Sequence, residues 1–509
     1  MLRIPRASRL HFHDVGTWSP CAYRLVALRT TTTTTTRRCM MMMTSTQTTT
    51  RKPKEEGSVA SIFPSLSGSD PNLPPRFADL KKDIWTDSLV QSWRDVLDEL
   101  RGAVEEVAVK GKDIIPSVHF SDLKKGLSKE QISEIRRSGV VIVRGGVPRE
   151  EALDWKRSLM DYIALNGDKV KGYPDGNIQT RARTHPALLQ TQRALLQLWH
   201  SSDPEAKLSL GTPISYYDRF RIRLPGDRSF GLSPHIDGGS LERWEDPGYR
   251  ACFGAILTGR WREHDPFDAA PRLHACQDLY DAPNQCSVFR PWQGWTSMSA
   301  TGPGEGTLRV VPLLKVATAY LMLRPFFNPR TSSSGLDDWV VDLESTAFPG
   351  SQMGKIQELK ESTHPHLELS RTVVSVPRVE PGDQIYWHCD LIHAVEGFHG
   401  GQNDSSVLYI PAVPLTVQNA EYLRDQREHF NHGLPAPDFP GGEGESRFLD
   451  RGRQVDAQGE AIGLCALGFQ RFDDGPSASA GEARAVLEAN EILFPKIPTA
   501  AAAAALGVR

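Results

Sequence analysis

Helical spacing of apolar side chains dominates the chain before residue 140. From residue 76 to about residue 112, apolar residues recur at three- and four-residue intervals with charged residues between them. This spacing gathers the apolar side chains on one face and predicts an amphipathic helical region. Residues 127–137 predict a further short helix, because Ser128 is followed three positions later by Gln131, a capping-box arrangement.

A buried strand and two more helices are predicted next. Val140–Val143 is an uninterrupted run of β-branched residues bounded by glycine-containing turns, which is typical of a strand covered on both faces. Pro148, with two glutamates directly after the next residue, predicts a helix that continues to about Leu165. Pro186 opens another helix that reaches Trp199.

The second half of the chain favours strands. Short apolar runs between turn residues predict strands at Tyr249–Leu257, Thr307–Pro312, Thr372–Val376, Gln384–Trp387 and Val407–Val413. Val316–Pro325 fits either a strand or a short helix. Helical spacing returns at Asn419–His429 and Gly481–Leu493, and an alanine-rich tail, Thr499–Leu506, follows.

The composition is that of an ordinary globular protein. Of the 509 residues, 39% are hydrophobic and 24% are charged, and the net charge is −3. No apolar run approaches the roughly 18 residues that a membrane-spanning helix needs. Past the N-terminal region no long basic block indicates nucleic acid or a membrane surface as partner. The composition therefore gives no sign of a nucleic-acid or membrane partner, and the sequence does not indicate an oligomeric state.

The cysteines and the N-terminal region bear on the cellular compartment. Seven scattered cysteines without a Cys-x-x-Cys pair predict reduced thiols inside the cell. The first 54 residues contain ten Lys or Arg but a single acid, Asp14, a composition typical of a mitochondrial transit peptide. The same composition also fits a low-complexity leader, or an upstream start that is not used, with translation beginning at Met40–Met43. The predicted location is cytoplasmic, or mitochondrial if the leader is a transit peptide.

His235 and Asp237 are candidate metal ligands. They lie two residues apart in FGLSPHIDGGSLERW, Phe230–Trp244, at the end of a predicted strand. Side chains i and i+2 of a strand point the same way, so an imidazole nitrogen and a carboxylate oxygen converge. They are two of the three protein ligands in the 2-His-1-carboxylate triad of non-heme Fe(II) oxygenases. An isolated His-x-Asp also occurs by chance, so a second histidine is required.

That histidine is predicted in PGDQIYWHCDLIHAVEG, Pro381–Gly397, where a turn and a short strand precede His388 and His393. His-x-Asp followed by Gly-Asp-x₄-His-x₄-His resembles the phytanoyl-CoA-hydroxylase-like branch of the Fe(II)/2-oxoglutarate oxygenases. The segments PHIDGGSLERWEDPGY, TAYLMLRPFF and YWHCDLIHAVEG also resemble the DUF1479 (YbiU-like) family. The resemblance covers roughly residues 75–475.

The resemblance implies both fold and chemistry. The implied fold is α+β, a double-stranded β-helix (jelly-roll) core with flanking N-terminal helices and large insertions. The implied metal ligands are His235, Asp237 and His393, with His388 as the second choice for the distal histidine. The implied cofactors are Fe(II) and 2-oxoglutarate, and O₂ would be consumed to oxidise, by hydroxylation or otherwise, a small molecule.

The predicted organisation has five parts. They are a leader or transit peptide at 1–54, a linker at 55–75, a helical N-terminal support at 76–212, the jelly-roll oxygenase core with insertions at 213–475, and a C-terminal helix and tail at 476–509.

2-Oxoglutarate needs a cation, ideally an arginine, for the carboxylate far from the metal. In the oxygenase branch that this chain resembles, that arginine follows the distal histidine on the next strand, but Ala394–Pro414 contains no Lys or Arg. Arg250, at the start of the predicted strand that follows His-x-Asp, is therefore the first candidate. Arg309 is the second, and Arg223 and Arg221 follow.

Two further groups of charged residues have open interpretations. Arg219, Arg221 and Arg223 alternate with apolar residues and share one face of a predicted strand, as a solvated face or as an anion-binding wall. Glu242 and Arg243 either contact a polar substrate or form a surface ion pair.

Three functional classes fit these observations. An Fe(II)/2-oxoglutarate-dependent dioxygenase is favoured. A cupin-type non-heme metal enzyme that does not use 2-oxoglutarate stays open because the arginine after the distal histidine is missing. A non-catalytic jelly-roll binding protein is the third, and the intact set of three ligands argues against it.

Overall fold

The structure is a computed structural model that describes residues 54–67, 72–167, 177–229, 231–331, 338–473 and 479–496. Nearly all of the predicted leader and the whole alanine-rich tail, Thr499–Leu506, lie outside the described residues. Within the predicted linker at 55–75, two short helices form, α1 (Val59–Ile62) and α2 (Pro64–Ser67).

The helical region predicted from residue 76 is confirmed as two helices, α3 (Arg76–Ile84) and α4 (Ser88–Lys110). They are separated at Trp85, whose backbone is extended. The buried apolar side chains of α4 recur every three or four residues: Leu89, Trp93, Val96, Leu100, Val104 and Val107. Because this stripe packs against the large core, α4 is stabilised by tertiary contacts more than by helix propensity.

The predicted capping box and buried strand are both confirmed. The Oγ atom of Ser128 accepts the N–H of Gln131, and the Gln131 side chain accepts the N–H of Ser128, at the start of α6 (Lys129–Ser138). Gly139 ends this helix with a left-handed backbone, a conformation that glycine adopts without steric cost. The chain then enters β2 (Val140–Arg144), whose first four residues are buried.

The larger sheet has six strands. β1 and β2 are parallel, and each later pair of neighbours is antiparallel. In spatial order the strands are β1 (Ser117–His119), β2 (Val140–Arg144), β12 (Gln384–His388), β6 (Trp292–Ser297), β14 (Ser405–Tyr409) and β4 (Phe220–Arg223). Two strands of the predicted N-terminal support thus join the sheet of the predicted core, and the boundary at 212/213 stays a prediction.

The second sheet has five antiparallel strands and carries the candidate ligands. In spatial order they are β10 (Gln357–Glu358), β5 (Leu232–Ile236), β13 (His393–Val395), β7 (Leu308–Val310) and β11 (Val374–Ser375). The register of β5 and β13 sets His235 directly opposite His393. Two residues far apart in the sequence are therefore brought side by side by strand pairing.

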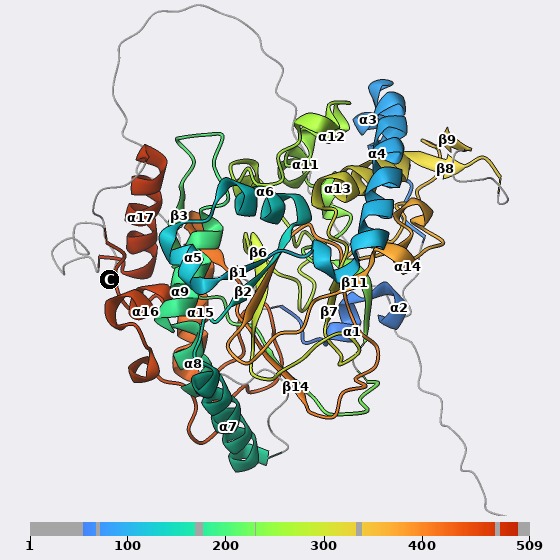
Figure 1. Cartoon of the computed structure of the whole chain (residues 1–509). Helices are drawn as coiled ribbons and strands as arrows, with labels where there is room; N and C mark the ends of the chain where they lie inside the picture. Colours follow the sequence, from blue (N-terminus) through green and yellow to red (C-terminus); the bar gives the residue numbers. More distant parts are fainter. Residues whose placement is uncertain are drawn as a thin grey trace, which may run out of the picture. The chain divides into compact units, whose positions relative to one another are not determined.

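The remaining strands form two small sheets, and a second apolar core lies against one of them. β3 (Leu208–Ile214) pairs with β15 (Val413–Thr416), and β8 (Phe327–Pro329) pairs with β9 (Trp339–Val341). α15 (Val417–His432) and α17 (Ala480–Leu493) pack on the first of these sheets around a separate apolar cluster. Figure 1 shows α17 beside β3, on the side of the fold away from α3 and α4.

The remaining α-helices range in length from the four residues of α10, α12 and α14 to the 18 residues of α7. The α-helices are α5 (Phe120–Lys125), α7 (Arg149–Asn166), α8 (Asn177–Arg183), α9 (Pro186–Leu196), α10 (Glu242–Glu245), α11 (Pro247–Ala251), α12 (Gly254–Leu257), α13 (Leu314–Leu323), α14 (Leu369–Thr372) and α16 (Glu460–Ala466). The 3₁₀ helices are η1 (Gly111–Ile114), η3 (Trp261–Glu263), η4 (Pro271–His274), η5 (Arg324–Phe326), η6 (Pro365–Leu367) and η7 (Gln454–Asp456).

The strand predicted at Tyr249–Leu257 is wrong, because this segment forms α11 and α12. Asp246 caps α11: its side chain accepts the N–H of Tyr249 at 2.6 Å, and Pro247 occupies the first helical position. The undecided segment Val316–Pro325 is also mostly helical, in α13, where nine of ten residues are buried. A helix buried on every side has no polar face, so its sequence resembles that of a buried strand.

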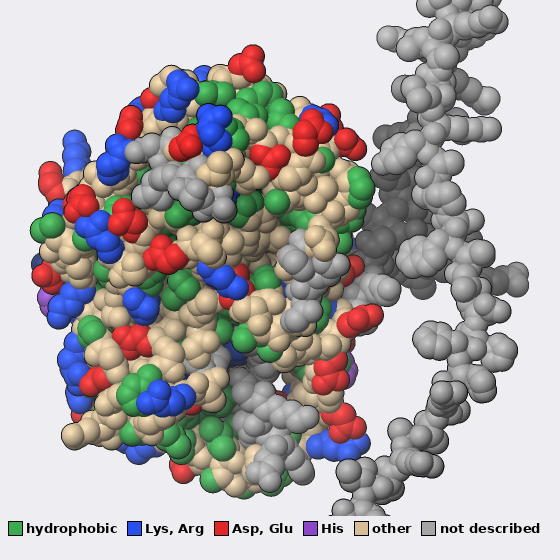
Figure 2. Space-filling model, turned by 90° about the vertical axis from the view of Figure 1, so that its right-hand side faces the viewer, with side chains coloured by type: hydrophobic (Ala, Val, Ile, Leu, Met, Phe, Trp, Pro, Cys, Tyr) green, Lys and Arg blue, Asp and Glu red, His purple; other side chains and the backbone are tan. Residues whose placement is uncertain are grey.

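The fold class is confirmed as mixed α+β with several sheets. Among the described residues, no pairing of strands closes the two larger sheets into one barrel, and the jelly roll stays a prediction. No helix in the described part of the chain is long and apolar enough to cross a membrane. Figure 2 shows basic and acidic side chains intermixed over one face of the molecule, as the small net charge leads one to expect.

Candidate metal centre

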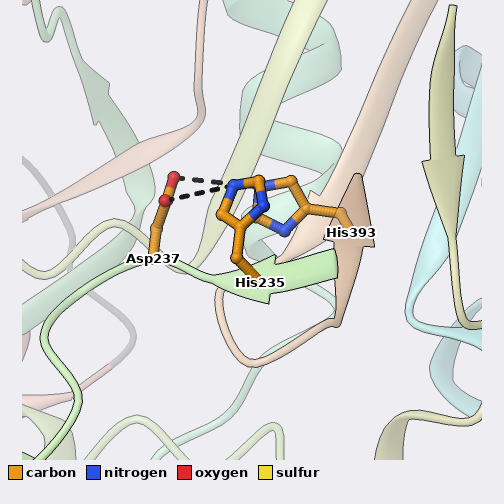
Figure 3. A group of neighbouring side chains, drawn as sticks. All are labelled: His235, Asp237 and His393. Carbon is orange, nitrogen blue, oxygen red and sulfur yellow. Dashed lines mark ion pairs between the residues drawn. The ribbon is translucent and has the colours of Figure 1, made fainter. Parts of the chain in front are cut away.

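The structure brings His235, Asp237 and His393 together at one end of the five-stranded sheet (Figure 3). One ligand atom from each lies within 4.8 Å of the others. The Nε2 atom of His235 is 3.6 Å from Oδ1 of Asp237, and Nε2 of His393 is 3.9 Å from its Oδ2. The three side chains therefore face one point, with two imidazoles from paired strands and the carboxylate beside them.

Hydrogen bonds orient both imidazole rings. The Nδ1 atom of His235 is 2.7 Å from the carbonyl oxygen of Ser233, and Nδ1 of His393 is 3.0 Å from that of Leu391. A carbonyl only accepts, so each Nδ1 carries the proton and each Nε2 presents its lone pair to the centre. Metal-binding histidines in proteins are held by the same kind of bond.

Arg243 fixes the loop that carries Asp237. The guanidinium donates to the carbonyl oxygens of Asp237, at 2.9 Å, and Gly239, at 2.7 Å. Gly238 and Gly239 both have positive φ, which lets the chain turn sharply after the ligand. Arg243 and Glu242 are both buried, so the predicted surface ion pair does not form.

The protonation states of the centre suit metal binding. Burial, with the neighbouring His235, lowers the pKa of His393 to about 3, so the imidazole is neutral at pH 7. Burial alone would raise the pKa of Asp237, but electrostatic interactions with His393, His235 and Arg290 outweigh burial and hold this pKa below its ordinary value. Neutral imidazole and ionised carboxylate are the forms that bind a cation.

His388 belongs to a different buried cluster. Its Nε2 atom is 3.0 Å from the carbonyl oxygen of Pro266, and its Nδ1 accepts the N–H of Asp390 at 3.1 Å. Asp390 in turn forms a buried ion pair with Arg272. Both nitrogens of His388 are thus engaged, and its ring stacks on Trp199. The geometry therefore favours His393 as the distal ligand.

The centre opens on a cavity of about 600 Å³ between the two larger sheets. Both sheets contribute walls: Trp295, Trp387 and Tyr409 from one, and Leu308 and Val395 from the other. Phe63, the single residue between α1 and α2, covers His235. Its ring lies edge-on to the imidazole at a centroid distance of 4.8 Å.

Of the four arginines predicted for the cosubstrate, the first three, Arg250, Arg309 and Arg223, do not line this cavity. Arg250 is on helix α11, where its Nη1 donates to the carbonyl oxygen of Trp244. Arg309 points away from the centre, because the next residue of β7, Val310, is the one paired with His393. Arg223 is buried beyond the cavity, bound to Asp227 and to the carbonyl oxygens of Gly306 and Glu396.

Arg221, the fourth candidate, lines the cavity from β4, and Arg219 lines it from the residue before β4. Phe220 and Ile222, which alternate with them, line it too, so the cavity wall does not follow one face of the strand. Arg290, two residues before β6, was not predicted: its Nη2 is 3.6 Å from Oδ2 of Asp237, and it lines the cavity. It precedes Pro291 in an irregular stretch, and no local pattern distinguishes it from other arginines.

Comparisons with known proteins identify a set of relatives. A family model described as Gig2-like matches residues 71–469. The Escherichia coli (strain K12) protein YbiU, described as uncharacterised, is 32% identical over 386 residues, which is 71% of this chain and 88% of YbiU.

Two solved structures agree with this chain over most of their length. The Candida albicans protein GIG2 (DUF1479), described as GlcNAc-inducible, is 30% identical with a TM-score of 0.77, covering 84% of this chain and 96% of GIG2. The Escherichia coli hypothetical protein JW0805 is 31% identical with a TM-score of 0.69, covering 79% of this chain and 99% of its own.

Proposed function

The chain belongs to the Gig2-like family, and from the geometry of its metal centre we propose that it is an Fe(II)/2-oxoglutarate-dependent dioxygenase that oxidises, by hydroxylation or a related reaction, a small molecule. The supporting observation is the set of His235, Asp237 and His393, whose donor atoms converge on one point at the wall of a cavity. Two imidazoles and one carboxylate that leave further positions open are the ligand set that suits non-heme Fe(II).

The residues of this chain would divide the work as follows. His235, Asp237 and His393 hold Fe(II), which with bound 2-oxoglutarate and O₂ supplies the oxidising chemistry. Ser233 and Leu391 keep the imidazoles aimed by accepting from Nδ1. The apolar walls from Trp295, Trp387 and Phe63 exclude water from the reacting groups.

We assign the far carboxylate of 2-oxoglutarate to Arg221. β4 pairs with β14, and Arg221 lies opposite Val407 on this strand, the next one after the distal histidine. β14 contains no lysine or arginine, and Arg221 on the paired strand β4 supplies the cation in its place. Arg221 is two residues beyond Arg219, a rise of about 7 Å along β4. Burial lowers the pKa of Arg221, yet a guanidinium stays charged at neutral pH.

We also propose that the two larger sheets are the two faces of a distorted double-stranded β-helix. The cavity walls come from both sheets, as expected for the interior of a jelly roll. This is also the architecture that the phytanoyl-CoA-hydroxylase-like branch implies.

The test is anaerobic titration of the Fe(II)-loaded protein with 2-oxoglutarate, followed by the visible charge-transfer band of the chelate. We expect a saturable band in the wild type, loss of iron in Asp237→Ala, and a weaker 2-oxoglutarate affinity with unchanged iron affinity in Arg221→Gln. The exposed His432 provides a matched control, since His432→Ala should retain both.

Each alternative gives a different result. Stoichiometric iron without a band would favour the cupin-type metal enzyme that does not use 2-oxoglutarate. A protein that binds no iron would favour the non-catalytic binding protein. Iron that is retained in His393→Ala but lost in His388→Ala would show that His388, and not His393, is the distal ligand.

A further inference from the structure

Two side chains with neutral N–H donors lie side by side on the cavity wall that the six-stranded sheet forms. Gln293 on β6 and Trp387 on β12 are directly opposite each other in the antiparallel pair, and both line the cavity. Opposite residues of paired strands present their side chains on one face, with Cβ atoms roughly 5 Å apart. The indole ring of Trp387 also lies beside the imidazole of His393, at a centroid distance of 5.3 Å. The pair is therefore adjacent to the candidate metal ligands.

Arg290 orients the amide of Gln293. Its Nη2 atom is 3.5 Å from Oε1 of Gln293 and 3.6 Å from Oδ2 of Asp237. A guanidinium only donates, so the amide oxygen faces Arg290 and the NH₂ group is turned away from it. The Nε2 atom of Gln293 has no hydrogen-bond partner among the described residues, although the residue is only 5% exposed. Because Gln293 lines the cavity, a molecule bound there is the acceptor that this NH₂ group can reach.

The indole N–H of Trp387 is the second donor. It is buried and likewise has no hydrogen-bond partner in the part of the chain that the structure describes. A buried donor without a partner lowers stability, and most such groups in proteins are bonded. The indole N–H groups of Trp155, Trp199 and Trp261 share this property, but these three residues do not line the cavity. The position of Trp387 beside Gln293 and His393 is what distinguishes it.

A carbonyl oxygen suits this pair of donors. Such an oxygen carries two lone pairs and no proton, so it can accept from two N–H groups at once. Both donors are uncharged, and the same cavity is lined by the apolar side chains of Phe63, Leu232 and Leu308. A ligand with an apolar body and a carbonyl group would match the donors and the apolar walls together.

We propose that Gln293 and Trp387 form a carbonyl-binding pair beside the metal centre, and that the substrate is a small, largely apolar carbonyl compound. Holding the carbonyl oxygen at Trp387, next to His393, keeps the neighbouring carbon atoms of the substrate close to the metal ligands. The pair also determines specificity, because an analogue without the oxygen leaves both donors unpaired. This pair names the substrate class for the dioxygenase proposed above and rests on that proposal.

The experiment compares a ketone with a hydrocarbon of the same shape on the full-length protein. 1-Tetralone and tetralin, which differ by a carbonyl group in place of a CH₂ group, are titrated into protein loaded with redox-inert Zn²⁺ and saturating 2-oxoglutarate. The tryptophan indoles carry ¹⁵N, and the N–H resonance of Trp387 is assigned by its loss in Trp387→Phe. We expect 1-tetralone to bind about ten-fold more tightly than tetralin, as suits two hydrogen bonds from neutral donors. Only 1-tetralone should move the Trp387 N–H resonance downfield.

The variants locate the pair. Trp387→Phe keeps an aromatic ring without the N–H, and Gln293→Met keeps the length of the side chain without the amide. Each should lower the ratio of ketone to hydrocarbon affinity to about three, and the double variant should bring it close to one. Trp261→Phe removes an indole N–H that also lacks a partner among the described residues but does not line the cavity, so it should leave the ratio unchanged. If Gln293→Met does not fold, Gln293→Glu keeps the shape, lacks the donor and should lose the same share of the preference.

Three results would overturn the carbonyl-binding pair. The first is wild-type protein that binds 1-tetralone no more tightly than tetralin. The second is a preference for the ketone that is undiminished in the double variant. The third is a Trp387 resonance that 2-oxoglutarate alone shifts and 1-tetralone does not shift further, which would assign the donors to the cosubstrate.

The charge-transfer band separates this pair from the proposed function. A band in the Fe(II)-loaded protein without a preference for the ketone rejects only the carbonyl-binding pair. A preference for the ketone without a band rejects only the use of 2-oxoglutarate.

Discussion

Arg243 supports the candidate metal centre by holding the loop that carries Asp237. It holds the carbonyl oxygens of Asp237 and Gly239 and is almost wholly buried. Groups that orient metal ligands typically contribute about ten- to a hundred-fold to metal affinity. We therefore expect Arg243→Met to weaken Mn²⁺ binding by about that factor in a calorimetric titration.

Arg243→Lys separates orientation from charge. A lysine keeps the positive charge but cannot reach two carbonyl oxygens as a fork. It should bind Mn²⁺ with an affinity between those of the wild type and Arg243→Met. An unchanged affinity in both variants, with a folded protein by circular dichroism, would show that the loop holds Asp237 without this arginine.

Glu242 makes stability depend on pH. Burial raises its pKa to about 7, although its Oε2 accepts the N–H of Ser240, and its Oε1 has no hydrogen-bond partner among the described residues. In the unfolded chain this pKa is near 4.5. Between pH 4.5 and 7 the unfolded chain loses a proton that the folded protein keeps, so the free energy of unfolding falls as pH rises, by up to about 3 kcal/mol.

Glu242→Gln removes that dependence. Glutamine is neutral at every pH and its Oε1 can still accept from Ser240. We expect urea denaturation to give a difference in the free energy of unfolding, variant minus wild type, that is larger at pH 8 than at pH 5. The quantity to compare is the change in the free energy of unfolding between pH 5 and pH 8. The new amide N–H group adds a free-energy cost that is the same at both pH values, so it cancels from this change. An identical difference in wild type and variant would contradict the raised pKa.

At the scale of elements, residues 54–67 form a strap that covers the candidate metal centre. Lys54 anchors one end: its Nζ is 2.6 Å from Asp278 and 3.3 Å from Asp438, and it donates to two backbone carbonyls. At the other end Ile62 and Phe63 pack on Ile356, and Ser65 donates to Glu358. The strap is thus held over His235 by the two buried ion pairs of Lys54, the hydrogen bonds of Ser65 and a small apolar cluster.

Lys54→Met should loosen the strap. The substitution leaves Asp278 buried without its cation, a kind of change that costs about 3 kcal/mol or more. We expect faster amide hydrogen exchange over residues 58–67 and a lower free energy of unfolding. The double variant Lys54→Met with Asp278→Asn should lose less than the sum of the two single variants. Exchange rates equal to wild type would show that the apolar cluster alone holds the strap.

Elements with local signals could be predicted from the sequence, and those without could not. The capping box at Ser128, the run Val140–Val143 and the strand before His235 each carry their signal within a few residues. The segment after Asp246 was predicted wrongly, because a short apolar run is typical of a strand and of a buried helix alike. The informative feature was the pair Asp246-Pro247, which is typical of the start of a helix. The error placed Arg250 on a strand facing the site and so misdirected the choice of cation.

At the scale of the whole molecule, the site depends on pairings that no local pattern contains. His-x-Asp and the distal histidine could be nominated from the sequence, but the opposition of His235 and His393 is a property of the register between β5 and β13. The approach of Arg290 to Asp237 likewise joins β6 to the other sheet across the cavity. Such contacts follow from the packing of two sheets and become visible only in the folded chain.

If the three ligands bind a metal, the same pairing makes metal binding contribute to the stability of the entire fold. A cation held by His235, Asp237 and His393 ties β5 to β13, and the unfolded chain offers no equivalent site. At a free metal concentration a hundred times Kd, binding to the folded state alone adds about 2.7 kcal/mol to the free energy of unfolding. For a chain of this size that corresponds to a rise in Tm of about 3 °C. Calorimetry with Mn²⁺ should show this rise, with reversal by a chelator and no rise in His393→Ala, whereas an equal rise in that variant would place the bound metal at another site.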